Sequence, residues 1–134
     1  MSVIVTDAGF QAAEQTQFAP LAAIADHQGA VDLAHTDDPE ALLPYLGQIK
    51  LIRIGFPAFN DGRGFTIAHR LRALGFTGRL RAFGPVIADQ YAMARRVGFD
   101  EVEIPDELAA RQPEAQWKFR ANWQDNDYQS RLRA

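Results

Sequence analysis

The feature that most constrains the fold is a recurring order of an apolar run, a turn and an amphipathic run, which begins near residue 30. This order is typical of βα units, in which helices connect strands that pair in parallel. At 134 residues, the chain fits one domain and is too short for a complete eight-stranded barrel. We therefore predict a single α/β domain over residues 1–134, with a βα core at 30–104 and a mostly parallel sheet of about four to five strands.

Apolar runs bounded by turn residues give the expected strands. Four are predicted, at residues 30–35, 50–56, 79–83 and 100–104. A further strand at 3–5 is compatible with the sequence. The chain after 104 is predicted to form a C-terminal helix and then an aromatic tail over 105–134, which contains Trp117, Phe119, Trp123 and Tyr128. We expect this tail to pack on its own core or on a second subunit.

Capping and stop residues give the expected helices. Asp37-Asp38-Pro39-Glu40 begins a short helix that extends to about Leu46, because Asp caps free N–H groups and Pro fits a first turn. Glycine ends the next two helices, since it adopts the left-handed conformation of a helix stop. The remaining predicted helices lie at 18–25, 64–74 and 87–97, with another segment starting at Pro105.

Each predicted strand carries charged side chains on alternate residues: Asp32, Arg53, Arg79, Arg81, Glu101 and Glu103. Side chains alternate across a strand, so the intervening residues form an apolar face: Val31, Leu33, Ile52, Ile54, Leu80, Ala82, Val102 and Ile104. A single apolar face favours a two-layer arrangement resembling part of a barrel wall, with the main helices on one side. Opposite charges predict cross-strand ion pairs. The polar face is then either solvated or partly covered, or it lines a cavity or a dimer interface.

Composition excludes several classes of protein. The net charge of −3, without a basic tail, argues against a nucleic-acid binder, which needs clustered Lys and Arg. No apolar run approaches the roughly 20 residues of a membrane span. Residues 1–10 lack a secretory signal, so we expect a cytoplasmic protein. The chain has no cysteine, and His27, His35 and His69 do not have metal-ligand spacing, so we predict neither a metal nor a cofactor.

The loop at residues 56–64 is the best candidate for function, since it joins a strand to a helix through glycines, a carboxylate and a guanidinium. Gly62 and Arg63 immediately precede helical N–H groups that favour anions, so a phosphate, sulfate, sulfite or carboxylate is a candidate ligand. The alternative is that Asp61 caps the helix and pairs with Arg63. The glycine spacing only distantly resembles a dinucleotide fingerprint, and a nicotinamide or flavin protein is the weakest of the alternatives.

A second polar group follows the next strand. Asp89 and Gln90 are expected on the same sheet edge as Asp61 and Arg63 if the strands are parallel. With two carboxyl groups on adjacent loops, one is able to act as a general acid and the other as a general base. Asp is also common at helix starts for structural reasons. His35, after the first core strand, is a candidate proton carrier, whereas His69 is expected to be exposed.

Two joined motifs carry a family resemblance. They are Phe56-Pro57-x-Phe59-x-Asp61-Gly62-Arg63-Gly64-x-Thr66-x-Ala68 through Leu71-Arg72, and Gly78-x-Leu80-Arg81-Ala82-x-Gly84-x-Val86-Ile87-x-Asp89-Gln90 through Arg96-x-Gly98-Phe99-Asp100. They resemble a bacterial family of unknown function, commonly linked to sulfite reduction because its genes lie beside those of sulfite reductase. The family usually has Asp where Pro85 stands and often Cys where Val97 stands.

The resemblance implies an accessory protein of sulfite reduction or sulfur assimilation, which binds a small anion or a partner enzyme such as sulfite reductase. The alternative is a small-molecule enzyme in which Asp61 and Asp89 act as acid and base, while Arg63 and Arg81 orient an anionic substrate. Matching positions make Gly62, Arg63, Arg81 and Gln90 the candidate ligand-binding residues. Without cysteine ligands for an iron–sulfur cluster, the chain is not the reductase by itself. The polar sheet face and aromatic tail predict a homodimer.

Overall fold

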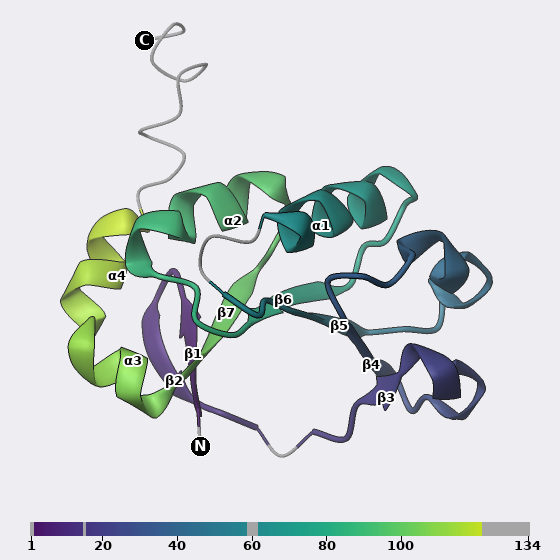
Figure 1. The fold of residues 1–134 in the computed structure, drawn as a ribbon, viewed down its shortest axis with the longest axis horizontal. Coiled ribbons are helices and arrows are strands. Elements are labelled where there is room, and N and C mark those ends of the chain that lie inside the picture. Colours follow the sequence, from purple (N-terminus) through teal and green to yellow (C-terminus); the bar gives the residue numbers. More distant parts are fainter. Residues whose placement is uncertain (1, 15, 59–61, 122–134) are drawn as a thin grey trace, which may run out of the picture.

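The computed structural model describes residues 2–14, 16–58 and 62–121, which contain one seven-stranded sheet in the order β2-β1-β7-β6-β5-β4-β3 (Figure 1). The strands β3 to β7 are parallel and follow chain order, whereas β1 is antiparallel to both β7 and β2. Their bounds are β1 Ser2–Thr6, β2 Gly9–Ala12, β3 Ala19–Pro20, β4 Ala30–Leu33, β5 Leu51–Gly55, β6 Arg79–Phe83 and β7 Glu101–Pro105.

Helical segments alternate with these strands, which confirms the predicted α/β class. They are η1 Leu21–Asp26, η2 Pro39–Tyr45, α1 Arg63–Ala73, η3 Ala88–Gln90, α2 Tyr91–Val97, α3 Asp106–Arg111 and α4 Glu114–Arg120, where η marks a 3-10 helix. In η2, the Asp38 side chain caps the first turn as predicted, accepting from the Glu40 N–H at 3.0 Å. Pro44 lies inside η2 and lacks an N–H, which accounts for a 3-10 helix at this position.

The predicted count of four to five strands was too low. The β1–β2 hairpin extends the sheet at one edge, and the two-residue β3 extends it at the other. β2 was missed because Gly9-Phe10-Gln11-Ala12 has little intrinsic strand preference and is ordered by pairing with β1. The Phe10 N–H donates to the Glu114 carboxylate at 2.8 Å, so α4 covers part of this outer strand.

The two layers predicted from the strand pattern are present. Figure 1 shows α1 and α2 along one face of the sheet, while the chain from β2 to β3 runs past the other. All eight predicted apolar-face positions are buried, none more than 2% exposed, and they pack with α1 residues including Ile67 and Leu71. The core therefore lies between the sheet and these helices.

The polar face is partly covered by the chain that joins β2 to β3. Because these strands lie at opposite edges of the sheet, their connection has to cross it. Its described residues bring Glu14 to Arg79 and Arg81, and Phe18 over Arg53. The prediction of a partly covered polar face is confirmed.

The start of the predicted tail packs on the core of its own chain. Trp117 of α4 is only 1% exposed, and its ring meets that of Tyr91 edge to face, with centroids 6.1 Å apart. The Tyr91 hydroxyl donates to Asp7 in the β1–β2 turn. Burial, followed by this hydrogen bond, raises the pKa of Tyr91 well above its ordinary value. Trp123 and Tyr128 lie outside the described residues.

Replacing Tyr91 with Phe is expected to lower the free energy of unfolding by about 1–2 kcal/mol at neutral pH, because a partly buried hydrogen bond to the charged Asp7 is lost. The pKa of Tyr91 is raised in the native protein, so as pH rises the unfolded state releases the Tyr91 proton before the native state does. This contribution to stability is therefore present below about pH 10 and declines as pH rises above that value. Urea unfolding between pH 8 and 11 tests this, since the variant is expected to lose less stability across the range. An equal decline in the free energy of unfolding with pH for the two proteins would contradict this prediction.

Candidate functional site

The parallel pairing of β5 and β6 brings the two motif loops to one edge of the sheet. The chain after β5 leads to Gly62 and Arg63, and the chain after β6 leads to Asp89 and Gln90. The prediction that these segments share an edge is confirmed. Asp61 lies outside the described residues. His35 follows β4 at the same edge, and His69 on α1 is exposed as expected.

Two motif glycines fit the loops against each other. Gly84 has φ +136°, and a Cβ there would lie 2.2 Å from the Phe56 carbonyl oxygen. A Cβ on Gly64 would lie 2.4 Å from the Phe56 ring. Both distances are below any real Cβ contact, so only glycine lets the chain after β6 and the start of α1 approach Phe56 this closely. These two positions therefore shape the site by packing.

Gly62 and Arg63 occupy the N-terminus of α1. Gly62 is the N-cap, and no side-chain hydrogen bond from the described residues caps this helix. Arg63 is the first residue of an 11-residue helix and is exposed. The helix dipole and the guanidinium both favour an anion at this position. Anion binding by these two residues stays a prediction.

Gln90 and Asp89 have partners within the fold. The Gln90 Oε1 accepts from the Ile87 N–H at 3.1 Å, which caps η3. The Asp89 side chain is 71% exposed, and its Oδ1 accepts from Arg120 Nη2 at 2.8 Å. This ion pair joins η3 to α4, so Asp89 has at least one structural contact beyond its position at a helix start.

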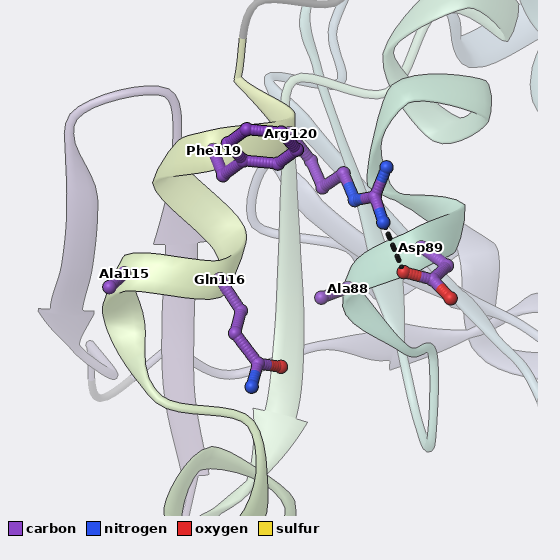
Figure 2. Close-up of a pocket in the computed structure, with 6 residues that line it drawn as sticks. All are labelled: Ala88, Asp89, Ala115, Gln116, Phe119 and Arg120. Carbon is purple, nitrogen blue, oxygen red and sulfur yellow. Dashed lines mark hydrogen bonds and ion pairs between the residues drawn. The ribbon is translucent and has the colours of Figure 1, made fainter.

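A hollow of about 430 Å³ lies between η3 and α4 (Figure 2). We call it the η3–α4 hollow; it is lined by Ala88, Asp89, Ala115, Gln116, Phe119 and Arg120. The Asp89–Arg120 pair closes one side of it. Phe119 is 73% exposed, the largest exposed fraction among the large apolar side chains of the described residues. The sequence placed Phe119 in an aromatic tail but gave no sign that it would face outward beside a hollow.

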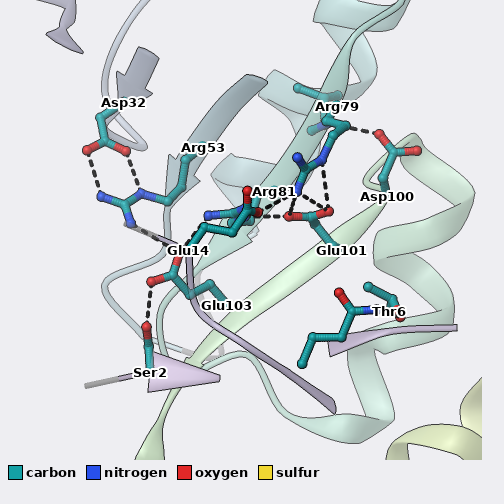
Figure 3. A network of polar contacts seen from close by, with 12 residues as sticks. Ser2, Thr6, Glu14, Asp32, Arg53, Arg79, Arg81, Asp100, Glu101 and Glu103 are labelled. Carbon is teal, nitrogen blue, oxygen red and sulfur yellow. Dashed lines mark hydrogen bonds and ion pairs between the residues drawn. The ribbon is translucent and has the colours of Figure 1, made fainter. Parts of the chain in front are cut away.

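Arg81 lies in the middle of β6, on the face opposite α1 and α2, and is 1% exposed (Figure 3). Its Nε donates to Glu101 at 2.5 Å, its Nη1 to Glu103 at 3.1 Å and its Nη2 to Glu14 at 3.1 Å. These carboxylates surround the guanidinium, which supports a structural role. The structure thus separates Arg81 from the loop edge that carries Arg63 and Asp89.

The other charged residues of this face complete a network. Arg53 donates to both oxygens of Asp32, at 2.6 and 2.8 Å, and to Glu103 at 3.1 Å. Burial disfavours its charge, but hydrogen bonds and attraction from these carboxylates raise the pKa of Arg53. The Arg79 hydrogen bond lowers the pKa of Glu14 despite some burial. The predicted cross-strand ion pairs are confirmed, with four carboxylates facing three guanidinium groups.

Within the described ranges, no group of three or more His, Asp or Glu side chains is placed to hold a metal ion. None of the helices in that part of the chain is long and apolar enough to cross a bilayer. The loop edge therefore carries exposed charged side chains and a helix N-terminus, and the hollow has both apolar and charged lining residues.

These features define a single-domain α/β protein with a mostly parallel sheet, a covered polar face and an exposed aromatic side chain beside a hollow. The chain belongs to the family described as bacterial protein of unknown function (DUF934), whose model matches residues 30–133. The match covers both motif loops and the η3–α4 hollow. No curated protein and no solved structure matches the chain.

Proposed function

We propose that this protein is an accessory protein of sulfite reduction, which acts by binding a partner enzyme. The observation that carries the proposal is Phe119, a large apolar side chain that is 73% exposed beside the η3–α4 hollow. An exposed aromatic at a hollow with charged groups on its rim is typical of the centre of a protein interface. The link to sulfur metabolism rests on the motif resemblance.

The polar candidates support binding better than catalysis. An acid and a base need to reach the same substrate, but Asp89 is paired with Arg120 at the surface. Arg81 is enclosed by carboxylates and is not available to orient an anionic substrate. Catalysis by Asp61 and Asp89, anion binding at Gly62 and Arg63, a cytoplasmic location and a homodimer all stay predictions.

Replacing Phe119 with Asp is expected to weaken binding to the partner at least tenfold, because an apolar anchor is replaced by a charge at the centre of the contact. Binding of the purified chain to sulfite reductase holoenzyme is measured by biolayer interferometry. Leu43→Asp is the matched control, since Leu43 is also an exposed apolar residue (53%) but lies in η2, between β4 and β5.

Two results would overturn the proposal. One is equal binding by the native chain and the Phe119→Asp variant, with both proteins folded by circular dichroism. The other is consumption of sulfite by the isolated chain, which would place it among enzymes. Loss of binding in both variants would indicate a nonspecific apolar contact and would also contradict the assignment to the η3–α4 hollow.

A further inference from the structure

A second hollow, of about 350 Å³, lies at the carboxyl ends of β4, β5 and β6. Its lining includes Arg53, Gly55 and Phe83, which share the charged face of the sheet with Asp32. This is the face opposite α1 and α2. In open α/β sheets, ligands bind in the crevice outside the carboxyl ends of the strands. The hollow lies at this edge of the sheet.

Gly55 lines this hollow, although neither its backbone conformation nor its packing requires glycine. Its φ is not in the left-handed range, and a Cβ would meet only the Leu33 carbonyl oxygen, at an ordinary 3.7 Å. Gly84 differs, since packing requires glycine there. Glycine weakens a strand, and where the backbone does not require it, it often marks close approach by another group. Because Gly55 has no side chain, the hollow stays open. We call this hollow the Gly55 pocket.

The walls of the Gly55 pocket are apolar and aromatic. Pro20 lines it, together with Phe83, which is 36% exposed. The Phe83 ring lies 4.4 Å from the Arg53 guanidinium, which also stacks on Phe18 at 3.9 Å. Stacking and the ion pairs with Asp32 hold Arg53 in place, so this wall is preorganised. Apolar walls with a few polar groups are typical of small-molecule sites.

The polar groups of the pocket favour a cation. Asp32 and Asp37 contribute two carboxylates, against the single guanidinium of Arg53. The Asp37 Oδ2 accepts from the Ala34 N–H at 2.8 Å. A carboxylate has about four acceptor sites on its two oxygens, so the bond from Ala34 leaves Asp37 with capacity to accept from a ligand. The excess carboxylate would attract a positively charged donor and repel an anion.

We propose that the Gly55 pocket binds a small organic amine with a compact apolar body. The apolar body packs over Gly55 and against Phe83, and the ammonium group donates to Asp37. This site is independent of the η3–α4 hollow, because none of its lining residues is shared with that hollow. The amine is recognised by charge and shape together.

Three probes of nearly equal size separate the contribution of charge from that of shape: benzylamine, benzyl alcohol and benzoate. In a two-dimensional NMR titration, benzylamine is expected to give saturable shifts of the Gly55 and Ala34 amides. Benzyl alcohol is expected to bind at least tenfold more weakly, and benzoate is expected to give no saturable shift. Equal affinity for benzylamine and benzoate would overturn the proposal.

Two variants locate the site. Gly55→Val fills the pocket with a residue that favours strands, and it is expected to weaken benzylamine binding at least tenfold. Asp37→Asn keeps an acceptor for Ala34, and it is expected to lose the preference for benzylamine over benzyl alcohol. Gly55→Ala, which adds only a Cβ in ordinary contact, replaces the valine variant if that fails to fold. Unchanged benzylamine affinity in a folded Gly55 variant, or an unchanged preference in Asp37→Asn, would refute the assignment.

Discussion

Replacing Arg81 with Met is expected to lower the free energy of unfolding by about 3 kcal/mol, the low end of the range for breaking a buried ion pair. Arg81 is 1% exposed, and its loss would leave Glu101 and Glu103, each 5% exposed, with fewer partners. The low end is expected because Glu101 keeps Arg79, and Glu103 keeps Arg53. Met fills much of the side-chain volume, so the effect reports mainly on charge. Urea unfolding at pH 7 measures it.

A matched control is the Arg70–Glu40 pair, whose ends are 2.7 Å apart but whose side chains are 49% and 54% exposed. Because exposed pairs contribute little, Arg70→Met is expected to cost less than about 1 kcal/mol. Adding Glu101→Gln to Arg81→Met should restore part of the lost stability, since it removes a buried charge with too few partners. If Arg81→Met and Arg70→Met have equal effects, the buried network is not a major source of stability.

The strand pattern predicted this face well because alternation is a local property of the chain. The bounds of β6 at 79–83 match the prediction, and the charged and apolar positions of β4 to β7 lie on the faces expected for them. What covers the charges was not predictable. Glu14 reaches Arg79 and Arg81 across sequence separations of 65 and 67 residues, and no local pattern indicates such a partner.

The candidate site was predicted less completely than the fold. Parallel pairing confirmed that Arg63 and Asp89 share an edge, but the Asp89 contact with Arg120 depends on where α4 packs. Phe119 and Phe83 appeared in the sequence as ordinary aromatics, because exposure follows from tertiary packing. Gly55 offered a signal that was missed, since it is a glycine inside the strand predicted at 50–56.

Replacing Gly84 with Ala is expected to cost about 2–6 kcal/mol of unfolding free energy, because two penalties combine. The backbone φ of +136° strains any residue with a Cβ, which costs roughly 1–3 kcal/mol. The added Cβ would also lie 2.2 Å from the Phe56 carbonyl oxygen, and backbone atoms cannot move aside as a flexible side chain can. Overpacking of this kind costs about another 1–3 kcal/mol. Urea unfolding compares the variant with the native protein.

Gly62→Ala in the neighbouring loop is the matched comparison. Among the described residues, nothing lies within 4 Å of a Cβ at Gly62, and its φ is −89°, so the change is expected to stay within about 1 kcal/mol. A large loss of unfolding free energy in Gly84→Ala, with none in Gly62→Ala, would show that the two motif glycines have different roles. Gly84 would then be required by the contact with Phe56, whereas Gly62 would be free of any folding requirement. Equal losses at both positions would contradict this division and would mean that the loop before α1 is as tightly constrained as the chain after β6.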